Sequence, residues 1–432
     1  MQYIEILVLV VSFVALLTIG VPIAYSIGIS VVFTLLVSTA PTPAFTTIAQ
    51  RMATGLDSFA LLAIPFFILA GQIMNHGGIA SRLINFAKGL TGSLPGGLAY
   101  VNVVANMLFG AISGSAGATA SAIGGIMHPR MVKEGYEPSY SAAVNITSAT
   151  TGLVIPPSNI LIVYSLASGG VSISALFLAG YIPGILMGLA LMLVAGVIAR
   201  KRGYAVGERV PFKTVVLQFF DAFPSLLLLI IVIGGIVAGL FTATEASAIA
   251  VLYTLVLSMG VYREIKPADL PDILIKSVIT TAIVMLLVGT SMSMSWVLSY
   301  AEIPQRVTAA LLGLSDNLFV ILIIINLILL AIGIFMDMTP AVLIFTPIFL
   351  PVVTALGVDP VHFGIVMVLN LCIGLCTPPV GAVLFIGCSV AGISIGRVIK
   401  PLVPMFLAMI LILLVVTYWP ELSLWLPGLF EL

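Results

Sequence analysis

The sequence predicts an all-helical membrane protein that crosses the bilayer many times and consists of two inverted repeats. Three observations lead to this fold class. Of the 432 residues, 61% are hydrophobic and only 7% are charged, and the mean hydropathy is +1.27. Apolar runs long enough to cross a bilayer occur throughout the chain. One segment of the first half also recurs in the second half.

Charged residues are too scarce to cover a soluble surface, because soluble domains have about 25% of them. This composition excludes a cytosolic enzyme, a nucleic-acid-binding protein and a disordered scaffold. The three cysteines, Cys372, Cys376 and Cys388, form no CxxC pair and are expected to be small buried residues. The N-terminus lacks a basic region and a cleavage site, so we expect the first apolar segment to remain as a membrane span.

Eight segments are apolar and long enough to be simple spans. They lie near residues 4–20, 21–40, 57–75, 173–199, 222–241, 244–262, 270–299 and 395–419. Four further apolar stretches are interrupted by Gly, Pro, Ser, Thr or Asn, namely 96–130, 139–168, 317–354 and 361–390. Irregular backbone at membrane depth is tolerated only inside protein or beside water, so the functional site is expected in these stretches.

An internal repeat indicates how the interrupted stretches fold. When the sequence is shifted by 222 positions, residues 113–173 align without gaps with residues 335–395, and twelve of 61 positions are identical. All four prolines of the first segment align with prolines, and Pro156-Pro157 aligns with Pro378-Pro379. Unrelated apolar segments rarely match in this way, so the chain is expected to contain a duplication.

Each half is expected to have two spans, a third span with a short amphipathic arm, a re-entrant hairpin, a helix broken at Pro-Pro and a final span. The predicted parts are a first repeat at 1–200, a cytoplasmic linker at 201–221 and a second repeat at 222–432. The hairpins are predicted at about 92–133 and 317–354, and the broken helices at about 139–168 and 361–390. Each half then crosses five times, which inverts the second half, as is typical of secondary transporters.

The positive-inside rule predicts the orientation. The densest basic cluster is Arg200-Lys201-Arg202, with Arg209 nearby. If this cluster is cytoplasmic, fourteen of the sixteen basic residues lie inside, and only Arg51 and Arg306 lie outside. Both termini are then periplasmic, and the C-terminal tail with Glu421 and Glu431 is acidic.

In the first half, small residues at Ser113–Thr119 form the predicted hairpin tip. They allow either a close helix contact or cation binding through Ser hydroxyls and carbonyl groups. The facing break is Thr150–Asn159, where Pro156-Pro157 ends the first half-helix and leaves carbonyl groups upstream free. Ser158 or Asn159 is expected to cap the second half-helix, whose N-terminus suits a carboxylate. Asn145, Thr147 and Ser148 precede the break and either bind directly or bond neighbouring helices.

In the second half, the tip is Gly333–Pro340, where we expect Thr339 as N-cap and Pro340 as the first helical residue. Asp337 is a carboxylate deep in the interrupted region, which either binds a cation or lies in a hydrated crevice. The second break offers Gly374 and Thr377 before Pro378-Pro379. Neither break contains Lys or Arg, so an anionic substrate would depend on amides, hydroxyls and bound cations.

Two outer segments complete the pattern. Thr242 and Glu245 fit a capping box at a helix start. Arg51 is expected either at the water interface or at an interface with a partner protein.

Four strings carry a family resemblance, namely Ser58–Phe67, Thr242–Ala246, Asp337–Ala341 and Cys376–Gly381. Through them, almost the whole chain resembles the large membrane subunit of tripartite ATP-independent periplasmic (TRAP) transporters, the DctM-like family. The resemblance implies Na⁺-driven uptake of an organic acid (a dicarboxylate, a sialic acid or another sugar acid) across the bacterial inner membrane. It also implies a periplasmic substrate-binding protein and a small four-span membrane subunit, here expected to be a separate chain, and an elevator-type architecture.

By the same resemblance, each hairpin tip and its facing break would hold one Na⁺, which makes two or more ions. One site would comprise Ser113, Ser115, Thr151, Gly152 and Pro156, and the other Gly333, Thr339, Gly374, Thr377 and Pro379, with Asp337 as a further candidate. The substrate candidates are Ser158, Asn159, Asn145 and Thr339.

Three alternatives remain at this stage. A sodium–carboxylate symporter of similar architecture would work without a binding protein. An intramembrane enzyme is disfavoured, because there is no HExxH and Asp337 has no clear catalytic partner in the sequence. An ATP-driven permease would need an ATPase on another chain, because there is no GxxxxGK[ST] motif.

The orientation is testable by cysteine labelling. A membrane-impermeant maleimide should label Ala205→Cys only after the membrane is opened, because the basic linker is predicted to be cytoplasmic. It should label Glu421→Cys in intact cells. Labelling of residue 205 from outside would contradict the predicted topology.

Overall fold

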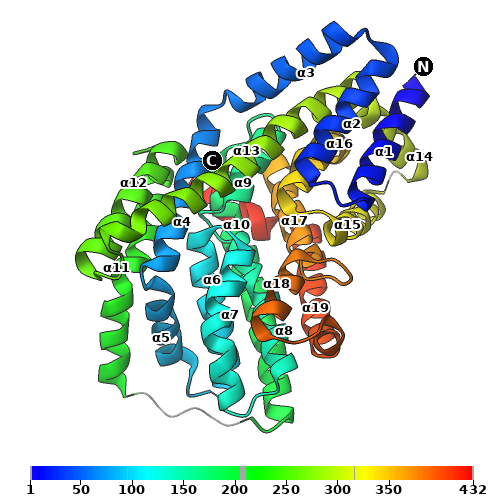
Figure 1. Ribbon diagram of the computed structural model, residues 1–432. Coiled ribbons are helices and arrows are strands. Elements are labelled where there is room, and N and C mark those ends of the chain that lie inside the picture. The colour runs from blue at the N-terminus through cyan, green and yellow to red at the C-terminus, as the bar shows by residue number, and fades with distance from the viewer. Residues whose placement is uncertain (1, 95, 205–210, 316, 431–432) are drawn as a thin grey trace.

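The computed structural model is helical throughout the residues that it describes, 2–94, 96–204, 211–315 and 317–430 (Figure 1). Residue 205, Arg209 and Glu431, which enter the predicted orientation, lie outside these ranges. Within them, eight helices are long and apolar enough to cross a membrane. The all-helical membrane fold class is therefore confirmed.

The first half contains ten α-helices and two 3₁₀ turns in the described ranges. They are α1 (Gln2–Thr18), α2 (Ile23–Ser38), α3 (Pro41–Leu56), η1 (Phe59–Leu62), α4 (Ala63–His76), α5 (Ile79–Thr91), α6 (Gly97–Ser113), α7 (Ala116–Lys133), α8 (Pro138–Ala149), η2 (Thr151–Leu153), α9 (Asn159–Ala167) and α10 (Ile173–Lys201). In Figure 1, α10 ends and α11 begins at the lower end of the view, whereas α3 crosses the upper end.

The second half continues with another ten α-helices in the described ranges. They are α11 (Phe212–Val237), α12 (Ala243–Leu255), α13 (Leu270–Tyr300), α14 (Ile303–Leu314), α15 (Leu318–Phe335), α16 (Met338–Ala355), α17 (Pro360–Gly374), α18 (Ala382–Ala391), α19 (Ile395–Tyr418) and α20 (Glu421–Leu429). A π-helical turn, η3 (Val256–Val261), extends α12, and a 3₁₀ turn, η4 (Pro267–Asp269), precedes α13.

Six of the eight predicted spans coincide with helices that are long and apolar enough to cross a membrane, and the first two are shorter. The segments 4–20 and 21–40 form α1 and α2, which have 17 and 16 residues. The helices α15 and α16 are also long and apolar enough to cross a membrane. The re-entrant course of the hairpin formed by α15 and α16, the inversion of the second half and the domain boundaries therefore stay predictions.

The helix α3 was not predicted. It packs on α13, where Ser293 Oγ donates to the carbonyl oxygen of Ile48 at 3.3 Å. The guanidinium carbon of Arg51 lies 5.1 Å from the centre of the Trp296 ring. Arg51 therefore makes a cation–π contact within the chain, and its role toward a partner stays a prediction.

Both hairpins turn at positions that the repeat equates. Ser115 is the N-cap of α7, and its hydroxyl accepts from Ala118 N at 3.3 Å. Asp337, 222 positions later, is the N-cap of α16, and its carboxylate accepts from Met338 N at 2.9 Å. The prediction that Thr339 caps this helix is wrong. Thr339 and Pro340 lie inside the first turn, where the missing amide of a proline costs no intrahelical hydrogen bond.

Both helices are broken at Pro-Pro as predicted. The first break separates α8 from α9, and the second separates α17 from α18. The Pro156-Pro157 and Pro378-Pro379 bonds are both cis. The same local sequence therefore produces the same backbone geometry in both halves.

Further contacts recur at the same spacing of 222 residues. The Tyr140 hydroxyl donates to the carbonyl oxygen of Ala195 at 2.8 Å. Nε2 of His362 lies 3.3 Å from the carbonyl oxygen of Thr417. These equivalent contacts tie the start of each broken helix to the last long helix of its half, as a duplication would lead us to expect.

Close glycine contacts hold each hairpin against its facing break. A Cβ atom on Gly152 would lie 2.4 Å from Gly110 Cα, and one on Gly374 would lie 2.6 Å from Gly333 Cα. Real Cβ atoms do not approach backbone atoms so closely. Each pair thus lets the first arm of a hairpin touch the broken helix directly.

Substitution of these glycines should destabilise the protein. Gly152→Ala and Gly374→Ala are each expected to cost about 1–3 kcal/mol through overpacking, and so to lower the melting temperature of the purified protein. Gly125→Ala is the matched control, because Gly125 lies in α7 with open space around its Cα. That change should be neutral or slightly stabilising, since alanine favours helices. Equal melting temperatures for all three variants would contradict the contact.

Candidate functional site

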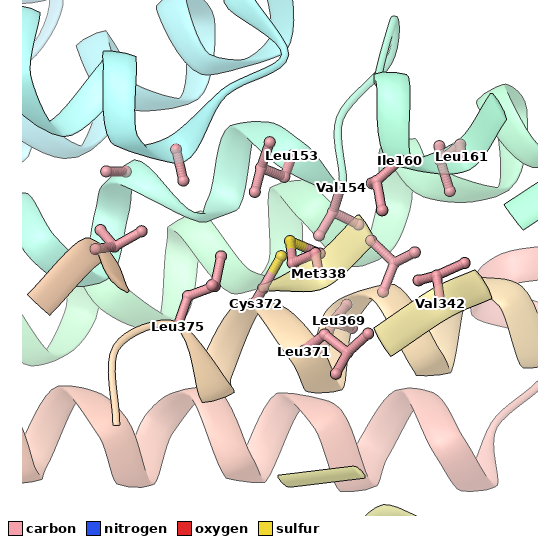
Figure 2. Close-up of a cluster of buried hydrophobic side chains, with 14 of the residues drawn as sticks. Leu153, Val154, Ile160, Leu161, Met338, Val342, Leu369, Leu371, Cys372 and Leu375 are labelled. Atoms are coloured by element: carbon pink, nitrogen blue, oxygen red, sulfur yellow. The ribbon is translucent and has the colours of Figure 1, made fainter. Parts of the chain in front are cut away.

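The hairpin tips and the breaks meet around one cavity of about 390 Å³. Its lining comes from the first hairpin tip, the start of α16, the two breaks and one face each of α4 and α13. Figure 2 shows apolar packing in this region: Leu153 and Val154 of the first break lie near Met338 of α16 and Cys372 of α17. The first break also touches the end of α17, because Cys372 Sγ donates to the carbonyl oxygen of Thr150 at 3.4 Å.

Five of the predicted site residues line this cavity. They are Ser113, Ser115, Asn159, Asp337 and Thr339. Asp337 is an exposed residue between the buried residues Met336 and Met338, and it belongs to the lining of the cavity. The lining contains no Lys or Arg among the described residues. The cavity therefore combines hydroxyls and one carboxylate without a cationic side chain.

The other predicted residues lie outside the lining. Asn145, Thr151, Gly152, Pro156 and Ser158 are buried in the first half, and in the second half Gly333 and Gly374 are buried, Thr377 is half-buried and Pro379 is exposed. Two of these hydroxyls donate along their own helices: Thr151 Oγ1 to Ser148 O at 2.6 Å, and Thr377 Oγ1 to Ile373 O at 2.8 Å. Their oxygen lone pairs remain available as acceptors.

Asn145 is engaged between helices, which is one of the two alternatives that the sequence left open. Its Nδ2 donates to Ala120 O at 2.8 Å, and its Oδ1 accepts from Asn106 at 3.2 Å. Asn106 also donates to Ser148 Oγ at 2.9 Å. In the second half, Asn370 Nδ2 donates to Asn326 Oδ1 at 2.7 Å. Sequence reasoning missed Asn106, Asn326 and Asn370, although an Asn inside an apolar stretch is itself a signal.

The start of α9 offers unsatisfied polar groups. Ser158 occupies the N-cap position, but its side chain makes no capping bond. Ser158 therefore occupies the expected N-cap position, but its side chain does not cap the helix. Ser158 Oγ and Asn159 Oδ1 are both buried without a hydrogen-bond partner in the described part of the chain. A Cβ on Gly114 would lie 3.0 Å from Asn159 Nδ2, so this helix start packs against the first hairpin tip.

Sequence reasoning missed the part of the lining that comes from α4 and α13. Gln72 and Asn75 of α4 and Thr280 of α13 line the cavity. They belong to segments that the sequence presents as simple spans. The available signal was a pair of carboxamides three residues apart in an otherwise apolar helix.

The predicted capping box at the start of α12 is confirmed. The Thr242 hydroxyl accepts from Glu245 N at 3.3 Å, and the Glu245 carboxylate accepts from Thr242 N at 2.8 Å. The Thr244 hydroxyl donates to the carbonyl oxygen of Phe59 at 2.8 Å. This contact joins the beginning of α12 to the entrance of α4, the helix that lines the cavity.

A polytopic helical protein with paired hairpins and broken helices around an internal cavity has the architecture of a membrane transporter. The solved structure of the Alcanivorax borkumensis YdaH transporter is similar, with a TM-score of 0.65 and 15% identity, over 87% of this chain and 88% of that chain. At this identity the likeness supports the fold alone.

The chain belongs to the family of the DctM component of tripartite ATP-independent periplasmic transporters, whose family model matches residues 10–422. It is 58% identical to "Uncharacterized protein YgiK" of Salmonella typhimurium, over 98% of both chains. It is 37% identical to the C4-dicarboxylate TRAP transporter large permease protein DctM of Rhodobacter capsulatus, over 96% of this chain and 97% of that protein. It is 39% identical to the sialic acid TRAP transporter large permease protein SiaM of Vibrio cholerae, over 96% of both chains.

Family membership establishes the coarse identity. The chain is a multi-pass inner-membrane protein with a transport role, and its family works on organic acids together with a small membrane subunit and a periplasmic binding protein.

The N-cap role of Asp337 can be tested separately from its charge. Asp337→Ala removes the acceptor for Met338 N and should cost about 1 kcal/mol of stability. Asp337→Asn keeps a good N-cap acceptor, so its melting temperature in Na⁺-free buffer should stay close to that of the unmodified protein. Equal losses in the two variants would contradict the capping role.

Proposed function

We propose that this chain is the transport subunit of a Na⁺-driven uptake system for an organic acid, which is a dicarboxylate, a sialic acid or another sugar acid. The observation that carries the proposal is the cavity at which both hairpin tips and both breaks meet. It offers hydroxyls and the amide end of a helix, and its described lining has no Lys or Arg. Bound cations would supply the positive charge that an anionic substrate requires there.

Two Na⁺ ions are proposed, one at each pair of hairpin tip and facing break. In the first half, the candidates are the hydroxyls of Ser113, Ser115 and Thr151 with the backbone of Gly152 and Pro156. In the second half, they are Thr339 and Thr377, the backbone of Gly333, Gly374 and Pro379, and the carboxylate of Asp337. Oxygen atoms of this kind are the ligands that a hard cation prefers. Asp337 gives the second site a full negative charge, whereas its equivalent in the first site, Ser115, is neutral.

The substrate carboxylate is assigned to the start of α9. The first amides of this helix have no intrahelical partners and favour an anion. Asn159 lines the cavity, and the preceding residue, Ser158, has a buried hydroxyl without a hydrogen-bond partner in the described part of the chain. Thr339 completes the set from the opposite tip. Asn145 already bonds Asn106 and Ala120, so its contribution would be to hold the helices in place.

The working complex would include a small four-span membrane subunit and a periplasmic binding protein, with Arg51 at a partner interface. Both termini would be periplasmic. The hairpins and broken helices would move together as one transport domain, in an elevator mechanism. Direct contacts between the two broken helices, such as Cys372 of α17 with Thr150 at the first break, support joint movement of the two halves of that domain.

The proposal is tested by uptake in proteoliposomes that contain both membrane subunits. Uptake should require an inward Na⁺ gradient and the binding protein. Ser115→Ala and Thr377→Val should each raise the Na⁺ concentration for half-maximal uptake several-fold, because each removes an oxygen ligand. Thr354→Val is the control, since Thr354 is exposed on α16 away from the cavity.

Three outcomes would contradict parts of the proposal. Uptake that is independent of Na⁺ would overturn the coupling. Uptake that proceeds equally well without the binding protein would favour the self-sufficient symporter. Unchanged Na⁺ activation in both variants would overturn the site assignment.

A further inference from the structure

One wall of the cavity carries polar side chains that the Na⁺ and carboxylate sites do not use. We name it the α4–α13 wall, and its polar members are Gln72, Asn75 and Thr280. Gln72 and Asn75 lie three residues apart in α4, so both project from the same side of the helix. The remaining lining of α4 is apolar or glycine.

The α4–α13 wall lies directly against the first hairpin tip. A Cβ on Gly71 would lie 3.0 Å from the carbonyl oxygen of Ser113. This close approach places the neighbouring Gln72 beside the tip that also supplies Ser115 to the lining. A molecule in the cavity would therefore face the tip and the α4 carboxamides together.

Neither carboxamide is used for internal structure. Within the described part of the chain, the side chains of Gln72 and Asn75 form no hydrogen bond, although Gln72 is half-buried and Asn75 is exposed to the cavity. Polar side chains in a membrane span are costly unless they find partners. The cavity is where these two carboxamides can find them.

The chemistry of the wall selects a class of ligand. A carboxamide both donates and accepts hydrogen bonds, and so does a hydroxyl group, whereas an ionised carboxylate only accepts. A second carboxylate of the substrate would face this neutral wall in a cavity that already holds the Asp337 carboxylate, with no Lys or Arg among the described lining residues. A chain of hydroxylated carbons carries no charge, so it does not need a cationic partner in the cavity.

We propose that Gln72 and Asn75 bind the hydroxyl-bearing end of a hydroxylated monocarboxylate, while its carboxylate lies at the start of α9. This assignment rests on the proposed function and narrows it: the substrate is a sugar-acid-like compound, not a dicarboxylate. Gln72 and Asn75 then determine specificity, and the Na⁺ ligands do not.

Three acids of equal chain length separate the possibilities. Gluconate is a six-carbon monocarboxylate with hydroxyl groups, hexanoate lacks the hydroxyls, and adipate carries a second carboxylate. Apparent affinities would be measured by thermal-shift titration of the purified pair of membrane subunits in saturating Na⁺. Gluconate should bind more tightly than either of the other acids.

The variants Gln72→Leu and Asn75→Leu should each weaken gluconate binding roughly tenfold, as expected for the loss of a hydrogen bond or two. They should leave hexanoate binding and the stabilisation by Na⁺ alone unchanged. Gln305→Leu is the matched control, because Gln305 is exposed on α14 outside the cavity. The Na⁺ response of each variant also shows that it is folded.

The inference is wrong if adipate or hexanoate binds as tightly as gluconate, if no acid stabilises the protein in Na⁺, or if both variants keep the preference for gluconate. Failure of the proposed function looks different. It appears as the absence of Na⁺-driven uptake and of stabilisation by Na⁺ alone, whichever acid is present.

Discussion

The structure depends on one constraint: backbone amide and carbonyl groups within a membrane need partners that lipid cannot supply. Each Pro-Pro pair interrupts a helix and leaves such groups without helical partners, once before α9 and once before α18. The fold encloses both breaks in protein. Glycine pairs bring a hairpin arm against each break, and Cys372 bonds Thr150 across the gap between them. The cavity lies beside both breaks, with Leu153 and Leu375 in its lining, so the interrupted helices border the candidate site.

Proline and glycine explain why so much of the fold was predictable. Both act on the backbone locally, so Pro156, Pro378 and the small residues around Gly114 indicated breaks and a turn without knowledge of the neighbours. The helix α3 was missed because its sequence is only weakly apolar, and its packing on α13 depends on residues such as Ser293, far away in the chain. The α4–α13 wall was missed for the same reason: only folding brings Gln72 and Thr280 to one cavity.

Individual roles at the site were harder to predict than its location. Asp337 and Thr339 are both good caps two residues apart, and local rules alone did not select Asp337. Asn145 was expected either to bind a ligand or to bond neighbouring helices, and its bond to Asn106, 39 residues away, is a contact of the second kind. Ser158 is of a residue type that commonly caps helices, but its hydroxyl is buried and has no hydrogen-bond partner in the described part of the chain. Sequence thus located the polar groups, whereas packing determined which of them remain free.

The proposal of a single substrate site rests on residues that differ between the two similar halves. Ser115 and Asp337 occupy equivalent N-caps, yet only the second is a carboxylate, so the proposed cation site beside Asp337 would be the more negative one. At the breaks, Ser158 and Asn159 correspond to Val380 and Gly381, which have no polar side chains. This difference favours the proposed binding of an anionic substrate at the start of α9, because the equivalent position in the second half has no polar side chains. The two halves have similar backbone frames, and in the proposed function the residues that differ between them would place the cation and the anion at different positions.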